Sequence, residues 1–226
     1  MALTGSDVVF IDDGGVLSDN DRRAPQWRRL VGEYFAPRLG GAPEAWARAN
    51  VGAFERSWAR YLAYLEDVGA RGGVDRWIRD DRGRWLVDMC EQVGVTPPSE
   101  PGAEAVAAGA WISERVHAEI PGAGDAVRGL ARRGLVLHTA SGGLSWELEP
   151  YLRGMGVREH FDRLYGPDLV DTHKNGTHYY AAILAHAAVD PSAAIVVDDG
   201  ESPRAWAAAA GLRTYASLAE LLAAID

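Results

Sequence analysis

Two short apolar segments, far apart in the chain, both end abruptly in aspartates. Residues 8–11 read Val-Val-Phe-Ile and precede Asp12, whereas residues 195–197 read Ile-Val-Val and precede Asp198 and Asp199. Short β-branched runs of this kind are typical of buried strands in a parallel sheet, and ligands bind beyond the carboxyl ends of such strands. If the two strands are neighbours, their carboxylates meet and repel one another unless a hard cation such as Mg²⁺ lies between them. The sequence therefore predicts a metal site at one edge of a sheet.

The composition indicates one core of ordinary size, with room for an inserted lobe. The chain has 226 residues, of which 47% are apolar, and a net charge of −9. No segment approaches the roughly 20 apolar residues that span a bilayer, and the N-terminus lacks a basic-then-apolar signal segment. Cys90 is the only cysteine, so we expect it to be buried and the protein to be cytoplasmic. Scattered arginines in a negative chain argue against nucleic acid as a partner, and the chain is expected to be a monomer or a homodimer.

The basic residues hold a second clue. Of the 23 lysines and arginines, only Lys174 is a lysine. Lysine supplies a compact, flexible point charge, which the planar guanidinium of arginine does not. A functional role for Lys174 is therefore a hypothesis that stands beside chance survival.

The hydrophobic pattern divides the chain into a helical insert and an alternating core. Between residues 24 and 117, apolar and aromatic residues recur at helical spacing, and six of the eight tryptophans lie there; we expect most of these aromatic residues to form the core of the insert. After Pro121, helices and strands alternate, which implies right-handed crossovers and a parallel sheet. We expect helices near 122–133, 144–154, 176–188, 203–210 and 217–225, and strands near 135–140, 163–166, 194–197 and 212–215.

Four motifs in chain order resemble those of the haloacid dehalogenase superfamily of Asp-nucleophile hydrolases, in the subfamily with a helical cap inserted after strand one. Asp12 ends the first strand, Ser141 ends the second before two glycines, Lys174 is expected to open a helix, and the pair Asp198-Asp199 ends a later strand. Each motif is weak alone, but all four in order are specific. The resemblance implies an α/β fold: a three-layer Rossmann-like core with a parallel sheet, formed by residues 1–18 and 119–226, plus an inserted all-α cap domain of residues 19–118.

The resemblance also implies a role for each motif. Asp12 is similar to the nucleophile that forms an aspartyl-phosphate, a step for which a carboxylate is competent. Ser141 resembles the hydroxyl that holds a phosphate oxygen, and Lys174 the lysine that neutralises the nucleophile and the phosphoryl group. Backbone amides at a glycine-rich helix start attract anions, so further phosphate contacts are expected from Asp13, Gly142 and Gly143.

The implied metal is Mg²⁺. The resemblance implies that Asp199 takes the direct metal position and Asp198 a ligand or outer-shell position. The carboxylate of Asp12 and the carbonyl oxygen of Gly14 would complete the protein ligands. Together these motifs imply a Mg²⁺-dependent phosphatase that acts on a small phosphorylated metabolite.

The sequence departs from the family pattern at Gly14. The phosphatases of the family have there a second aspartate, which protonates the leaving group, and general acid catalysis is worth about 10²–10⁴-fold. Asp13 does not replace it by simple register, because adjacent residues of a strand face opposite sides. One explanation is that another residue supplies the proton, for which the candidates are Asp19, Asp21 and His178.

Two further explanations stay open. Dehalogenases of the family that cleave carbon–halogen bonds lack the second aspartate and work without metal, so the chain is alternatively a metal-independent 2-haloacid dehalogenase-like enzyme. The pair Asp198-Asp199 argues against this. The chain is otherwise a non-catalytic pseudoenzyme that binds phosphoryl ligands, although its retained nucleophile and lysine argue against decay. Phosphonate-cleaving relatives need a cap lysine, and the insert contains none.

Overall fold

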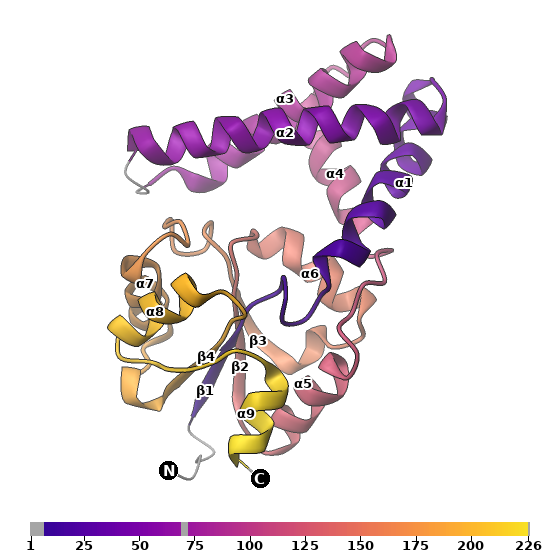
Figure 1. Ribbon diagram of the computed structural model, residues 1–226. Coiled ribbons are helices and arrows are strands. Elements are labelled where there is room, and N and C mark those ends of the chain that lie inside the picture. The colour runs from indigo at the N-terminus through magenta and orange to yellow at the C-terminus, as the bar shows by residue number, and fades with distance from the viewer. Residues whose placement is uncertain (1–6, 69–71, 226) are drawn as a thin grey trace. The chain divides into compact units, whose positions relative to one another are not determined.

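The computed structural model describes residues 7–68 and 72–225 and divides the chain into two compact units (Figure 1). The first, called here the core unit, ends at Asn20 and resumes at Ala118. The second, called here the helical unit, extends from Asp21 to His117. Among the residues described, no helix has both the length and the hydropathy of a membrane span.

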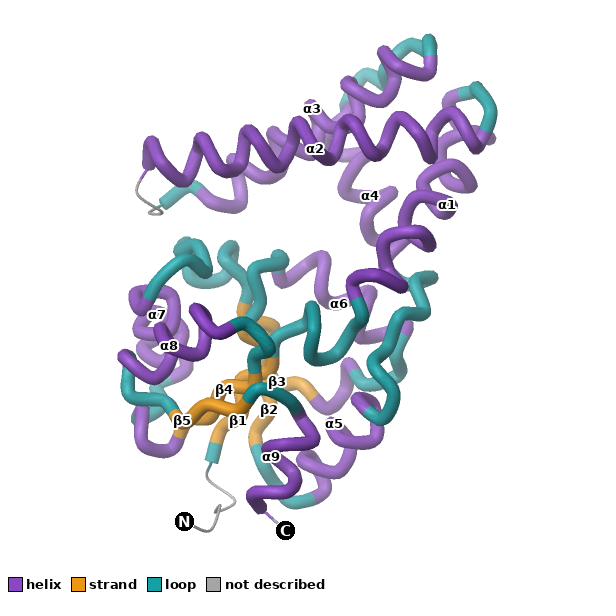
Figure 2. The backbone as a smooth tube through the Cα atoms, viewed as in Figure 1, coloured by secondary structure: helices purple, strands orange, loops and turns teal. Residues whose placement is uncertain are grey.

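The core unit is built on one parallel sheet, as predicted (Figure 2). The central strand β1 pairs with β2 on one side and with β4 on the other. Consequently, the segments that follow β1, β2 and β4 leave the sheet at the same edge. The strand order is β3-β2-β1-β4-β5, and the strands are β1 (Val8–Ile11), β2 (Val136–Ala140), β3 (Phe161–Tyr165), β4 (Ala194–Val197) and β5 (Arg213–Tyr215).

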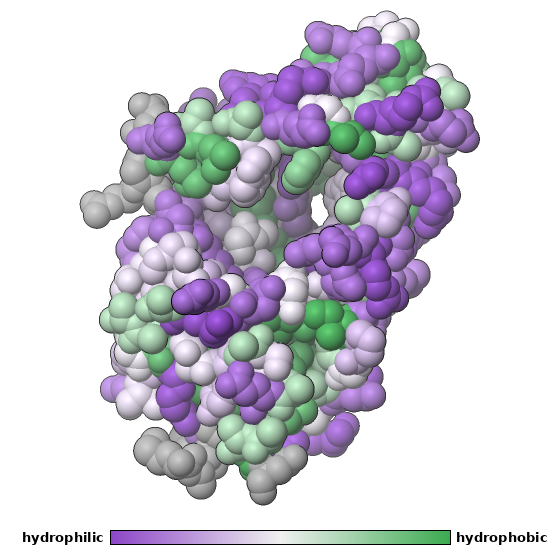
Figure 3. Space-filling model, viewed as in Figure 1, coloured by the Kyte–Doolittle hydropathy of each residue, from purple (hydrophilic) through white to green (hydrophobic). Residues whose placement is uncertain are grey.

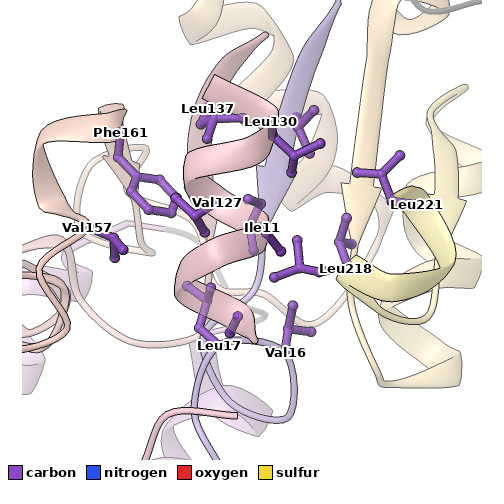
Figure 4. Packing of buried hydrophobic residues seen from close by; sticks show 14 of the residues in the cluster. Ile11, Val16, Leu17, Val127, Leu130, Leu137, Val157, Phe161, Leu218 and Leu221 are labelled. Carbon is purple, nitrogen blue, oxygen red and sulfur yellow. The ribbon is translucent and has the colours of Figure 1, made fainter. Parts of the chain in front are cut away.

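Helices cover both faces of this sheet, because alternate residues of each buried strand point to opposite sides. Val9 and Ile11 pack with α5, α6 and α9 on one face, where Figure 4 shows Ile11 among leucines and valines. Val8 and Phe10 pack with α7 and α8 on the other. This three-layer arrangement confirms the predicted Rossmann-like core. The helices are α5 (Ala123–Arg132), α6 (Ser145–Gly154), α7 (Thr177–Ala187), α8 (Glu201–Ala209) and α9 (Leu218–Ile225), with 3₁₀ turns η1 (Arg158–His160) and η2 (Pro191–Ala193).

The position of Lys174 in the secondary structure differs from the prediction. Helix α7 begins at Thr177, so Lys174 lies in the preceding loop instead of opening the helix. The loop turns sharply, because the backbone N–H of Asn175 donates to the carbonyl of His173 (2.9 Å). Lys174 therefore owes its position to a turn at the sheet edge and not to a helix end.

The helical unit consists of α-helices that pack through aromatic residues. Phe35 stacks on Trp46 with ring centroids 5.0 Å apart, and the Trp46 indole N–H donates to the carbonyl of Gly40 (2.8 Å). Cys90 is fully buried in this core, as expected. The helices are α1 (Asn20–Leu39), whose first residue belongs to the core unit, α2 (Pro43–Val68), α3 (Val74–Val93) and α4 (Pro101–Ser113).

Most of the aromatic residues of the insert were expected to form its core, but two on one side of α2 do not. Phe54 and Trp58 are 59% and 53% exposed, and Leu62 is 46% exposed. The opposite side of α2 packs on α3, where Tyr64 stacks on Trp77 with centroids 4.5 Å apart. A helix that contacts a partner on one side leaves its other side exposed, whatever its composition. The face of the molecule that Figure 3 shows has small hydrophobic patches among hydrophilic residues.

Candidate active site

Neighbouring strands bring three aspartates together at the carboxyl edge of the sheet. Ile11 is in register with Val197, and the backbone N–H of Asp12 donates to the carbonyl of Val197 (2.9 Å). One carboxylate oxygen from each of Asp12, Asp198 and Asp199 lies within 4.8 Å of the other two. Asp198 is buried and Asp199 is exposed, so the cluster extends from the protein interior to solvent.

Lys174 contacts residues at the carboxyl ends of three strands. Its ammonium nitrogen lies 2.9 Å from Asp12 Oδ1 after β1 and 2.6 Å from Asp198 Oδ2 after β4. It also donates to the carbonyl of Ala140 at the end of β2 (2.7 Å). An ammonium group has three hydrogens to donate, so these acceptors match its capacity. The only lysine of the chain therefore occupies a position that needs a compact cation.

The electrostatic balance of the cluster is negative. Three carboxylates and the ammonium group of Lys174 carry a formal charge of −2 together. The guanidinium of Arg204 lies nearby and donates to the carbonyls of Asp198 and Asp199 (2.7 and 2.6 Å). Burial raises the pKa of Asp12 to about 6; Lys174 lowers this pKa and Asp198 raises it. Burial alone would lower the pKa of Lys174, but the carboxylates of Asp12 and Asp198 outweigh burial and raise it. Lys174 therefore stays charged, while the acidic cluster retains an excess of negative charge.

Ser141 follows β2, the strand beside β1. Its backbone N–H donates to the carbonyl of Tyr165 (3.0 Å), and its hydroxyl oxygen accepts from the backbone N–H of Gly143 (3.0 Å). The carbonyl of Ser141 accepts from the hydroxyl of Tyr179 (3.0 Å). A Cβ at Gly142 would meet no atom within 4 Å. The hydroxyl therefore lies at an open glycine turn that precedes α6, where an anion has room to approach backbone amides.

Asp13, for which a phosphate contact is predicted, also makes hydrogen bonds within the protein. Its buried carboxylate accepts from the hydroxyl of Ser18 (3.1 Å), and its carbonyl accepts from the backbone N–H groups of Leu17 and Ser18 (both 2.9 Å). These bonds close the turn that follows β1. The side chain of Asp13 therefore holds this turn, and the phosphate contact of its backbone N–H stays a prediction.

Two glycines of this turn differ in what surrounds them. Gly15 has a φ of 79°, and a Cβ there would lie 2.1 Å from Asp199 Oδ2, so no side chain fits. Gly14 is not among the residues with positive φ, and a Cβ there would lie 3.0 Å from Asn20 Nδ2 and 3.2 Å from Asn20 Oδ1. The carboxamide of Asn20 thus lies against the position where the family has its second aspartate. Sequence reasoning missed Asn20, because no pattern links it to Gly14.

The three candidates for a substitute acid are placed as follows. His178 is exposed at the start of α7, and its Nε2 lies 2.9 Å from Asn175 Oδ1. Asp19 donates its backbone N–H to the carbonyl of Ala118 (2.7 Å). Asp21 is an exposed residue in the first turn of α1. The hydrogen bond to Asn175 engages one ring nitrogen of His178, and the three residues stay predicted candidates for the substitute acid.

Known proteins resemble this chain mainly in fold. A family model described as haloacid dehalogenase-like hydrolase matches residues 6–211. No curated protein matches the sequence. Solved structures that resemble the chain include the defluorinating L-2-haloacid dehalogenase Rha0230, with 16% identity and a TM-score of 0.66 over 95% of this chain and 83% of that one.

Two further structures show the same similarity. L-2-haloacid dehalogenase from Xanthobacter autotrophicus is 17% identical, with a TM-score of 0.56 over 92% of this chain and 76% of its own. A HAD family enzyme from Bacteroides thetaiotaomicron is 15% identical, with a TM-score of 0.57 over 95% of this chain and 93% of its own. At these identities, the likeness establishes a shared fold.

Proposed function

Because the chain belongs to the haloacid dehalogenase-like hydrolases, we propose that it is a Mg²⁺-dependent phosphatase that acts on a small phosphorylated metabolite through an aspartyl-phosphate on Asp12. The observation that carries this proposal is the cluster of Asp12, Asp198 and Asp199. Its three carboxylates outnumber the one ammonium group that contacts them, so the cluster favours a divalent cation. A metal-independent enzyme has no evident need for the exposed carboxylate of Asp199.

The donor set fits Mg²⁺. This ion prefers hard oxygen ligands and keeps several waters, and it is commonly held by one or two carboxylates together with substrate phosphate. Asp199 and Asp12 would hold it, with the carbonyl of Gly14, while Asp198 is engaged by Lys174. When bound, the ion would supply positive charge to the transferring phosphoryl group.

The residues of the chain have separate tasks in this proposal. Asp12 attacks phosphorus, and the electron pair of the broken P–O bond leaves with the substrate oxygen. Lys174 keeps Asp12 ionised and in place, because it contacts the nucleophile directly at 2.9 Å. The hydroxyl of Ser141 and the amides of the glycine turn hold phosphoryl oxygens where charge develops. Water then hydrolyses the aspartyl-phosphate and releases phosphate.

A metal-independent 2-haloacid dehalogenase is the second candidate. The observation that favours it is the contact of Lys174 with both Asp12 and Asp198. This contact already gives the nucleophile a cationic partner without any metal. The missing acid at Gly14 also agrees with it, because a halide leaves without a proton. The fold shared with L-2-haloacid dehalogenases is compatible with either candidate.

One screen separates the candidates. The purified protein is assayed with acyl, nitrophenyl and alkyl phosphates and with 2-haloacids, each with and without Mg²⁺. Mg²⁺-dependent phosphate release supports the phosphatase, whereas halide release that is indifferent to EDTA replaces it with the dehalogenase. Phosphate binding without any turnover identifies a pseudoenzyme.

Metal binding is tested separately by thermal unfolding. Because a ligand of the folded state stabilises it, Mg²⁺ should raise the melting temperature of the wild type. Asp199→Asn should abolish this shift, whereas Asp125→Asn on the exposed surface of α5 should preserve it. If calorimetry shows no Mg²⁺ binding even with phosphate present, the metal proposal is wrong.

A further inference from the structure

The carboxamide of Asn20 lies beside the acidic cluster in the core unit. Its Nδ2 and Oδ1 would lie 3.0 and 3.2 Å from a Cβ on Gly14. The next residue, Gly15, is in close contact with the carboxylate of Asp199, which itself belongs to the cluster with Asp12. Asn20 and Asp199 thus lie over two neighbouring glycines of the same turn. Asn20 therefore occupies the direction in which a side chain on Gly14 would project, and Gly14 is where the phosphatases of the family have their second aspartate.

The backbone does not require a glycine at residue 14. Gly15 has a positive φ, but Gly14 is not among the residues that do. The nearest atoms to a Cβ at residue 14 all belong to the side chain of Asn20. The neutral carboxamide of Asn20 therefore lies where a side chain on residue 14 would begin.

The side chain of Asn20 is available to a ligand. Asn20 is exposed, and among the contacts of the described residues its carboxamide has no hydrogen-bond partner. In-line attack by Asp12 sends the leaving group away from the nucleophile, which is itself largely buried, and hence toward the exposed rim of the site. A side-chain amide carries two N–H donors and no charge, so it can approach an oxygen that is becoming negative without adding charge to an acidic cluster.

We infer that the Asn20 carboxamide donates a hydrogen bond to the leaving-group oxygen of the substrate. This inference rests on the proposed phosphatase function. Asp12 forms a bond to phosphorus while the bond from phosphorus to the leaving oxygen breaks, and that oxygen keeps the electron pair. The amide keeps its own proton, so the departing oxygen takes a proton from water. Asn20 thus stabilises the leaving group without acting as an acid.

The consequence is a preference for phosphate esters with acidic leaving groups. A hydrogen bond stabilises an alkoxide only in part, whereas proton transfer removes its charge. Acyl and nitrophenyl phosphates should therefore react much faster than alkyl phosphates. The substrate class that the site favours is a phosphorylated compound whose leaving group is stable as an anion, such as an acyl phosphate or an enol phosphate.

The test is a series of phosphate esters with graded leaving-group pKa, measured as kcat/KM for the wild type, Asn20→Leu and Asn20→Asp. Asn20→Leu should lower kcat/KM for alkyl phosphates threefold to tenfold more than for nitrophenyl phosphate. Asn20→Asp introduces a group that can transfer a proton, so alkyl phosphates should gain at least tenfold relative to nitrophenyl phosphate. The same variant should add a loss of activity at high pH, where the new acid is ionised.

Controls separate this role from a structural one. Glu44→Leu replaces an exposed acidic side chain in the first turn of α2 by the same apolar residue and should leave the leaving-group dependence as in the wild type. Melting temperatures show whether each variant folds. Equal losses on every ester in Asn20→Leu, together with an unaltered slope in Asn20→Asp, would overturn the inference and leave the phosphatase function standing. If the wild type releases phosphate from no ester, both are overturned.

Discussion

The carboxylate of Asp199 lies directly against Gly15, so that a Cβ on Gly15 would come within 2.1 Å of Asp199 Oδ2. This contact couples the turn after β1 to the end of β4. It also fixes where the exposed member of the acidic cluster can lie. Two observations therefore require a glycine here. The Asp199 carboxylate leaves no room for a Cβ, and the φ of 79° is one that residues with side chains rarely adopt.

Gly15→Ala should therefore weaken metal binding. The new methyl group displaces the Asp199 carboxylate, and we expect the dissociation constant for Mg²⁺, measured by calorimetry, to rise at least tenfold. Positive φ by itself costs an alanine about 1 kcal/mol of stability. Gly122→Ala is the matched control, since Gly122 also has a positive φ (83°) but a Cβ there meets nothing within 4 Å. Equal Mg²⁺ affinities in the two variants would contradict the prediction.

Lys174→Arg should impair function although it keeps the charge. The ammonium nitrogen contacts Asp12, Asp198 and the carbonyl of Ala140 within 2.9 Å, and a planar guanidinium cannot converge on three acceptors from one point. We expect kcat/KM to fall at least tenfold, which corresponds to about 1.4 kcal/mol. Arg128→Lys on the surface of α5 is the reverse exchange and serves as the control. Kinetics like those of the wild type on every accepted substrate would show that the lysine has no special role.

Gly14→Asp should restore a proton donor. Gly14 has no positive φ, and the atoms nearest to a Cβ there belong to the flexible end of the Asn20 side chain, which can move. Alkyl phosphates should then gain more than nitrophenyl phosphate, because only the poor leaving groups need a proton. The measurement is kcat/KM against leaving-group pKa, together with Mg²⁺ affinity to detect displacement of the metal. A shallow dependence in the wild type would mean that another residue already supplies the proton.

The buried His138 predicts how stability depends on pH. Burial lowers the pKa of His138 to about 4. The charge of Asp162 raises this pKa, and the charge of Arg163 lowers it. The Nδ1 of His138 accepts a hydrogen bond from the backbone N–H of Arg163 (3.2 Å). Between pH 4 and about 6.5, the unfolded chain therefore binds a proton that the folded chain does not. The stability contributed by neutral His138 is complete above pH 6.5 and is lost as the pH falls, up to about 3 kcal/mol at pH 4.

His138→Gln should remove this dependence. The free energy of unfolding in urea, measured without Mg²⁺ from pH 4.5 to 7.5, should fall less steeply toward low pH in the variant than in the wild type. Asp12 has the opposite sign, because its pKa is raised to about 6 and its protonation favours the folded state as the pH falls. Only the difference between the two proteins isolates His138. Parallel curves would refute the prediction.

The sequence by itself determined the family and the architecture. Alternation of residues such as Val9 and Phe10 between two faces is a local pattern, so it marks a strand buried on both sides before any contact is known. The four motifs occur in the order that the family has, and this order can be read from the sequence. The family model that matches residues 6–211 confirms the resemblance. The expected meeting of the three aspartates followed from one further rule, that parallel strands end at the same edge. Their chemical roles stay predictions.

Only the tertiary structure decided which side chain lies beside Gly14. Asn20 reaches Gly14 because a turn held by Asp13 and Ser18 reverses the chain, and such a contact has no periodic signal. Likewise, the exposure of Phe54 on α2 depends on which side of the helix meets α3. Periodicity records which residues are apolar, whereas the backbone angles of a short turn and the position of a packing partner arise from the whole fold. The sequence therefore predicted the acidic edge of the sheet, and the structure alone placed an amide where the missing acid would be.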